Sequence, residues 1–216
     1  MNTRFNLKIS SAVLGGLLLG GASFGEEALK NPSFEDPVDA GMGYNWVSDR
    51  AVHWERWGGW FNRETTWAPV ISGQCMMAYH HWRIQGDETS GIFQDIGDVP
   101  AGKPYTFTVM VMKDKGANAD YVEIRLESYL GGQTLASKVY RMPEMKGGKW
   151  MPLSVTGVSP NKGIRVLVVT KPGRATQRKG AIKFDDASLV EETNPAVLAT
   201  MSPPQKNNAY GLMRRK

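Results

Sequence analysis

Two short acidic segments carry the residues of this 216-residue chain that are best suited to hold a metal ion. The first is Asn31-Pro-Ser-Phe-Glu-Asp36, and the second is Lys183-Phe-Asp-Asp-Ala-Ser-Leu-Val190. Carboxylates that meet at the two ends of a β-rich stretch repel one another unless a cation joins them, and calcium prefers such hard oxygen ligands. We therefore predict a structural calcium ion, held by Glu35 and Asp185 with main-chain carbonyls, that ties the first strand to the last.

A segment rich in aromatic residues offers a second kind of chemistry, the stacking of flat rings on sugars. Six of the seven tryptophans and all three histidines lie between positions 46 and 82. Aromatic faces give a sugar ring an apolar platform, while nearby polar groups bond its hydroxyls. Large aromatic patches are seldom left exposed without a purpose, so some of these rings must fill the core, and we assign Trp46 and Trp54 to it. The predicted ligand-binding residues are Trp57, Trp60, Trp67, Trp82 and Arg63.

Catalytic chemistry has weaker support in the same region. A glycosidase needs two carboxylates at a fixed separation across a cleft, and no spacing places any pair of the local acidic residues in that relation. No nucleophilic serine motif or phosphate-binding loop follows residue 25. The adjacent His80 and His81 point to opposite faces if they lie on a strand, so a zinc site is not expected. We expect a binding protein and not an enzyme, with a small polysaccharide-active enzyme as an alternative.

The charge of the chain argues against a nucleic-acid partner. The formal net charge is +5 with a sequence pI near 9.3, but the basic excess lies at the two ends. Residues 26–192 are almost neutral, and no basic stripe accompanies the aromatic residues.

The N-terminal segment has the pattern of an export signal, and the C-terminal segment has that of a flexible tail. Arg4 and Lys8 precede a short apolar run and a small-residue cleavage site, so we expect residues 1–25 to be a signal peptide and the protein to be secreted, either extracellular or periplasmic. The apolar run is too short to span a bilayer, and no transmembrane span is expected. Residues 193–216 are expected to form a flexible basic tail. Cys75 is the only cysteine, which excludes an internal disulfide and suits a packing role.

Between these ends, residues 26–192 have the pattern of one all-β domain. From residue 91 onward, short runs that alternate apolar and polar residues are separated by turn signals, which is typical of a β-sandwich. In the last run, Ile182 and Phe184 share one face, whereas Ala187 and Leu189 fall on the other. A β-bulge at Asp185-Asp186 would return Leu189 to the core and redirect a carboxylate. Alternatively, the buried part of the strand ends at Asp186.

Several motifs in their order along the chain resemble those of a known class of carbohydrate-binding modules. That class has a galactose-binding-domain-like jelly roll and is often appended to bacterial cellulases and xylanases. The resemblance covers nearly all of residues 29–190 and predicts an all-β, jelly-roll β-sandwich. The matching segments are Asn31-Pro-Ser-Phe-Glu35, Gly91-Ile-Phe-Gln94, Val99-Pro-Ala-Gly102, Tyr105-Thr-Phe-Thr108 and Lys183-Phe-Asp-Asp-Ala-Ser-Leu189.

The resemblance also implies a ligand and a metal. In these modules a calcium ion typically sits where the first and last strands meet, away from the sugar. The motif positions correspond to Glu35 and Asp185 here, with Asp186 and main-chain oxygens near Ser72-Gly73 as weaker candidates. The implied partner is a polysaccharide or glycan. Such modules usually accompany a catalytic domain, which this sequence does not show, so a cell-surface or matrix module that binds protein through the aromatic patch is the main alternative.

Overall fold

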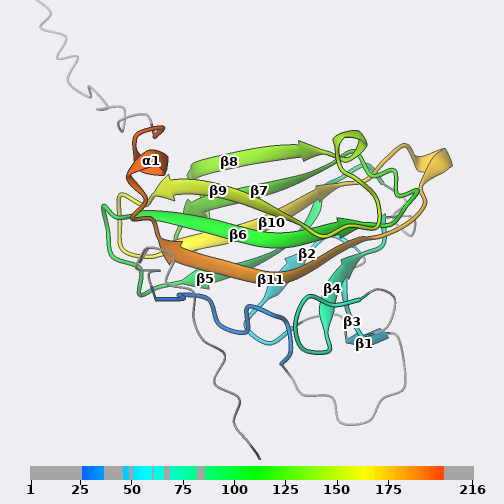
Figure 1. Cartoon of the computed structure of the whole chain (residues 1–216), viewed down its shortest axis with the longest axis horizontal. Coiled ribbons are helices and arrows are strands. Elements are labelled where there is room, and N and C mark those ends of the chain that lie inside the picture. The colour runs from blue at the N-terminus through cyan, green and yellow to red at the C-terminus, as the bar shows by residue number, and fades with distance from the viewer. Residues whose placement is uncertain are drawn as a thin grey trace, which may run out of the picture.

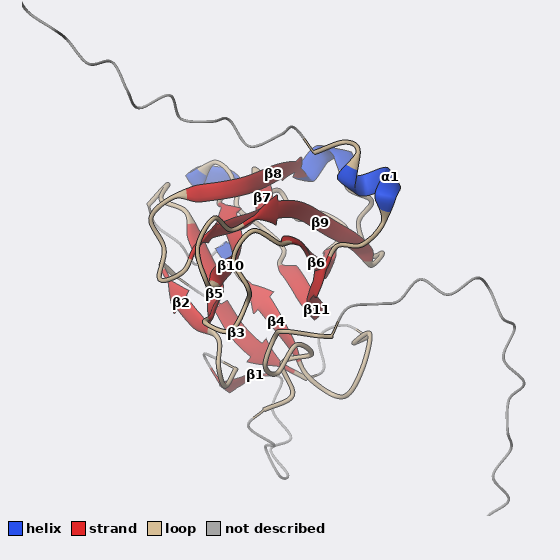
Figure 2. Cartoon of the chain, turned by 90° about the vertical axis from the view of Figure 1, so that its left-hand side faces the viewer, coloured by secondary structure: helices blue, strands red, loops and turns tan. Residues whose placement is uncertain are grey.

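The described part of the computed structural model comprises residues 26–36, 46–48, 51–59, 61–65, 69–81 and 86–201. Its strands form two antiparallel sheets that pack face to face (Figures 1 and 2). We call them the six-stranded sheet, with the order β1-β3-β4-β11-β6-β9, and the five-stranded sheet, with the order β2-β5-β10-β7-β8. The strands are β1 (Trp46–Ser48), β2 (Glu55–Trp57), β3 (Phe61–Glu64), β4 (Met76–Tyr79), β5 (Ser90–Ile96), β6 (Pro104–Lys113), β7 (Tyr121–Ser128), β8 (Thr134–Arg141), β9 (Met151–Val158), β10 (Ile164–Lys171) and β11 (Ile182–Glu191).

The chain crosses from one sheet to the other at most steps from β4 to β11, as in a jelly roll. The prediction of an all-β sandwich is therefore confirmed. Helical structure in the described residues is limited to short pieces: η2 (Met142–Glu144), η3 (Ala175–Gln177) and α1 (Pro195–Leu198). Helix α1 lies within the predicted tail, and the Asn194 side chain caps it by accepting a hydrogen bond from the Ala196 N–H. No helix among the described residues is long and apolar enough to cross a membrane.

The core forms where the inward-facing residues of the two sheets meet. In β6, for example, Phe107, Val109 and Val111 point inward and are fully buried, whereas the residues between them face outward. This alternation arises because successive side chains of a pleated strand point to opposite faces, and one face of β6 packs on the core. The core also contains Trp54, as predicted, and Cys75 is buried. Trp46 lies on β1, but its side chain is outside the described part.

The predicted bulge in the closing strand is confirmed. The pairing of β11 with β6 runs to Asp185 opposite Met110 and resumes at Ser188 opposite Thr108, with Asp186 at φ +41°. The extra backbone length returns Leu189 to the core, where it is fully buried.

The first described segment lies beside the last strand, as the sequence predicts. The Ala28 N–H donates to the Leu189 carbonyl at 3.0 Å, and the Ala187 N–H donates to the Pro32 carbonyl at 2.9 Å. In Figure 1 this segment, coloured blue, runs along the side of the sandwich where β5 and β11 face each other. It thus bridges the two sheets, through β11 of one and, by the hydrogen bonds between Lys30 and Gln94, β5 of the other.

Candidate functional site

The predicted calcium ligands converge on one short loop, residues 71–75. The Glu35 carboxylate accepts hydrogen bonds from the backbone N–H groups of Gln74 at 3.0 Å and Cys75 at 2.8 Å. The Asp185 carboxylate accepts one from Ile71 N–H at 2.7 Å. Gly73 makes this possible, because a Cβ there would lie 2.3 Å from the Glu35 carboxyl carbon.

The oxygen-rich character of this cluster suits calcium, and Asp186 adds a third carboxylate that accepts a hydrogen bond from the Ser72 hydroxyl. Within the described ranges, however, no three histidine, cysteine or acidic side chains lie close enough to hold a metal ion. Main-chain carbonyls would have to complete the coordination shell. The calcium site therefore stays a prediction.

Burial dominates the electrostatics of Asp185. Its side chain is fully buried, and loss of hydration raises its pKa to about 6, although the N–H groups of Ile71, Asp186 and Ser72 partly counteract that rise. The nearby negative charge of Asp186 adds to the increase.

Of the five predicted sugar-binding residues, the structure describes Trp57 and Arg63. Trp60, Trp67 and Trp82 lie outside the described residues. Arg63 is fully buried, which corrects its assignment to an exposed ligand-binding surface. It faces inward on β3 opposite Met77, and its Nη1 donates to the Glu35 carbonyl at 3.3 Å and the Cys75 sulfur at 3.1 Å. Arg63 thus supports the loop that holds Glu35.

Trp57 is half-buried at the end of β2, on the outer face of the five-stranded sheet. Its pairing partner is Gly91 on β5, and a Cβ on Gly91 would lie 2.0 Å from the Trp57 Cη2 and 2.5 Å from Cζ2 and Cζ3. The indole therefore packs directly against the backbone of Gly91, in a space that any larger residue would fill with its Cβ. We call this contact the glycine seat. Phe93 lies beside it, with ring centroids 6.1 Å apart. The sequence motif around Gly91 indicates a strand, but nothing in it indicates this seat.

The strand register arranges this outer face in rows across β5, β10 and β7. One row is Gly91, Val169 and Glu123; the next is Phe93, Leu167 and Arg125; the third is Asp95, Arg165 and Glu127. Val169 and Leu167 are 2% and 5% exposed, so the centre of the face is an apolar layer beneath longer side chains.

Guanidinium groups dominate the polar part of the face, and acidic neighbours hold each of them. Arg165 makes a two-point contact with Asp95, at 2.9 and 2.7 Å, and lies 4.3 Å from the Phe93 centroid. Arg125 contacts Glu123 at 2.8 and 2.9 Å and Glu127 at 3.1 Å. The hydrogen bonds that Arg125 donates to the Glu123 carboxylate are the main reason that the pKa of Arg125 is raised. These paired charges form a rigid, nearly neutral surface.

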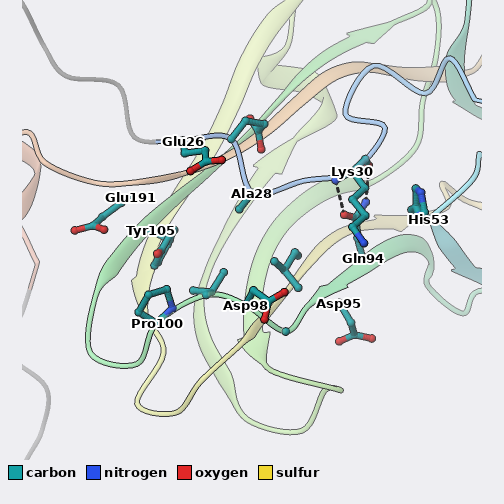
Figure 3. Close-up of a pocket in the computed structure, with 14 residues that line it drawn as sticks. Glu26, Ala28, Lys30, His53, Gln94, Asp95, Asp98, Pro100, Tyr105 and Glu191 are labelled. Atoms are coloured by element: carbon teal, nitrogen blue, oxygen red, sulfur yellow. Dashed lines mark hydrogen bonds between the residues drawn. The ribbon is translucent and has the colours of Figure 1, made fainter.

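A cavity of about 540 Å³ lies beside the first described segment and shares Asp95 with the outer face (Figure 3). The backbone of Lys30 and the side-chain amide of Gln94 exchange two hydrogen bonds at its edge, at 2.8 and 2.9 Å. Tyr105 lines the cavity but is only 6% exposed, so it offers little ring surface for stacking. The lining is otherwise rich in carboxylates: Glu26, Glu27, Asp95, Asp98 and Glu191. We therefore favour the outer face around Trp57 as the candidate site.

Comparison with known proteins finds solved structures that share this fold. No protein-family model and no curated protein matches the sequence. Among solved structures, the Stig cyclase FisC from Fischerella sp. TAU is similar with a TM-score of 0.62 and 16% identity, covering 79% of this chain and 98% of that one. TmCBM61, solved with β-1,4-galactotriose, has a TM-score of 0.52 and 19% identity over 77% of this chain and 99% of its own. The xylan-binding domain CBM22-1 of Paenibacillus barcinonensis Xyn10C has a TM-score of 0.51 and 14% identity, covering 81% and 100%.

These likenesses correct one expectation and support another. The expectation that the protein is not an enzyme is wrong as an inference from fold, because cyclases are among the similar structures. The resemblance to carbohydrate-binding modules is supported for the β-sandwich, while the galactose-binding-like type is not established. The chain has the β-sandwich fold that these cyclases and carbohydrate-binding modules share.

Proposed function

We propose that the outer face of the five-stranded sheet binds a polysaccharide or glycan, with Trp57 as the stacking residue. The observation that carries this proposal is the seat of the Trp57 indole on Gly91, beside Phe93. A ring held against the backbone has lost much of its freedom before a ligand arrives, so less entropy is lost on binding. An indole fixed in this way is suited to stack on a sugar ring.

The charge of the face favours an uncharged, hydroxyl-rich ligand. Arg165 is neutralised by Asp95, and Arg125 by Glu123 and Glu127. Paired groups of this kind still offer N–H donors and carboxylate acceptors to hydroxyls, while the pair as a whole exerts little attraction on a net charge. The ligands in the similar structures agree with this class, since TmCBM61 was solved with a galactotriose and CBM22-1 is a xylan-binding domain.

We further infer export of the protein, on the strength of the sequence pattern of residues 1–25, which lie outside the described part. Export would bring the outer face into contact with extracellular or periplasmic glycans.

Affinity electrophoresis in gels containing neutral polysaccharides tests the proposal. β-1,4-galactan and xylan are expected to retard the wild-type protein, and Trp57→Ala is expected to weaken binding about tenfold, because loss of a stacked ring costs about 1.4 kcal/mol. Trp150→Ala is the matched control, since it removes an indole next to β9 on the opposite sheet. Equal retardation of wild type and Trp57→Ala would reject Trp57 as the stacking residue. Absence of retardation of the wild type in every gel would reject the carbohydrate proposal.

We also propose that calcium binds at the loop of residues 71–75 through Glu35 and Asp185, with Asp186 in a supporting role. Both main ligands already contact this loop, and a cation there would relieve their repulsion.

Scanning calorimetry tests the calcium site. At a calcium concentration about 100 times the Kd, the melting temperature is expected to rise by roughly 5 to 10 °C over that in a chelator. Glu35→Gln should lose this rise, and magnesium, which demands smaller octahedral sites, should not reproduce it. The same melting temperature in calcium and in chelator would exclude the site.

A further inference from the structure

The turn between β7 and β8 carries a further aromatic residue, the exposed Tyr129, at the end of the same outer face. We propose that Tyr129 and Leu130, at this turn, form a second contact for the glycan chain that stacks on Trp57. This inference rests on the proposed function and deepens it, because it implies that the protein binds an extended internal stretch of a neutral chain.

Tyr129 is seated on glycines in the same way as Trp57. A Cβ on Gly163 would lie 2.8 Å from the Tyr129 Cγ, and one on Gly97 would lie 3.4 Å from the Tyr129 hydroxyl oxygen. The tyrosine is nevertheless 42% exposed. One side of the ring therefore covers the backbone of two glycines, while much of the residue remains open to solvent.

The contacts of Tyr129 place it at one end of the face that carries Trp57. Gly97, Gly163 and Tyr129 each lie two residues beyond a member of the row formed by Asp95, Arg165 and Glu127. These positions lie one residue beyond the paired ends of β5, β10 and β7. The contacts of Tyr129 with Gly97 and Gly163, and the hydrogen bond from the Leu130 N–H to Asp95, place the turn at this end of the outer face. From Gly91 to Gly97 the strand advances six residues, or about 20 Å. The two glycine-seated rings thus mark opposite ends of one face.

Leu130 has an unfavourable conformation that the fold does not explain. It adopts φ +62° in a tight turn closed by a 2.8 Å hydrogen bond from the Gly131 N–H to the Ser128 carbonyl. Glycine or asparagine is the usual residue at this turn position, because a Cβ is disfavoured there. The side chain is also 66% exposed, so it gains little from burial. Strain at an exposed apolar residue indicates a contact outside the folded chain.

Asp95 links this turn to the rest of the face. One oxygen of its carboxylate accepts hydrogen bonds from the Leu130 N–H and from the Arg165 Nε, both at 2.9 Å. Arg165 in turn lies over Phe93, which neighbours Trp57. The two ends of the face are therefore held in a fixed relation, which suits a ligand long enough to reach both.

Titration calorimetry with β-1,4-galacto-oligosaccharides and xylo-oligosaccharides, from disaccharide to octasaccharide, tests this inference. For the wild type, affinity is expected to rise with chain length until the chain reaches both rings. Tyr129→Ala should remove the gain in affinity, about tenfold, that long chains have over the disaccharide, and should leave the affinity for the disaccharide unchanged. Leu130→Asn should weaken long-chain binding while the melting temperature stays the same or rises, since asparagine tolerates the turn.

The outcomes separate this inference from the proposed function. If Trp57→Ala weakens binding but Tyr129→Ala and Leu130→Asn bind long chains as tightly as the wild type, the second contact is rejected and the carbohydrate site stands. If the wild type binds none of these oligosaccharides, both are rejected. Circular dichroism of each variant confirms that the turn substitutions leave the sandwich folded.

Discussion

Replacement of Gly91 by valine is expected to weaken binding to neutral polysaccharides at least as much as loss of the Trp57 ring does, while the protein remains folded. The added Cβ would lie 2.0 Å from the Trp57 Cη2, so the indole must leave its seat. The three nearest atoms to this Cβ all belong to Trp57, and the φ of Gly91 is not in the left-handed region. Valine is favoured in strands, which offsets part of the packing lost when the indole is displaced, so the sandwich is expected to remain folded. The variant thus tests the position of the ring without removing the ring.

Affinity electrophoresis and a thermal melt measure the two effects together. Binding is expected to weaken at least as much as in Trp57→Ala, by about tenfold or more, because the displaced indole also obstructs the face. Gly116→Ala is the matched control, since the nearest atom to its added Cβ is the Lys179 Cε at 3.9 Å. If Gly91→Val binds as well as the wild type, the glycine seat has no part in recognition.

The free energy of unfolding in a chelating buffer is expected to fall as the pH rises from about 4 to about 6, because of Asp185. Burial raises the pKa of this carboxyl from 3.8 to about 6 in the folded state, so the folded protein holds a proton that the unfolded chain has released. The stabilisation is complete below pH 3.8 and is lost as the pH passes 6. The loss amounts to up to about 3 kcal/mol.

Urea denaturation across this pH range, compared with Asp185→Asn, isolates the contribution of Asp185. The asparagine retains a carbonyl oxygen for the Ile71 N–H but cannot ionise, so its profile should lack this fall. His81 acts in the opposite direction, because its burial lowers its pKa and protonation below pH 6.5 destabilises the folded state. Since both proteins carry His81, its effect cancels in the difference. Parallel profiles would contradict a raised pKa at Asp185.

Local patterns were enough to predict the sandwich and its closure. The alternation in segments such as β6 follows from the pleat of a strand, which any half-buried strand must obey. The phase change between Phe184 and Leu189 indicated either a bulge or the end of the buried strand at Asp186, and the pairing of β11 with β6 shows the bulge. The opening motif predicted the meeting of the first and last segments, and the contact of Ala28 with Leu189 confirms it.

The candidate site depended on information that is not local. Arg63 follows an aromatic run, so the sequence predicts a surface residue. In the fold it pairs with Met77, and its side chain is buried. Fold likeness cannot separate binding from catalysis either, since chemistry resides in side chains that differ at these identities.

The sequence by itself thus determined that this protein is an all-β sandwich, because hydrophobic periodicity is a property of neighbouring residues, but it left open whether the last strand is bulged. Only the tertiary structure decided which rings are available to a ligand. Trp57 rests on Gly91 and Tyr129 on Gly163, contacts between residues more than thirty positions apart. Such contacts depend on strand register and on the absence of a Cβ in a partner strand, and neither leaves a mark in the pattern around the aromatic residue itself.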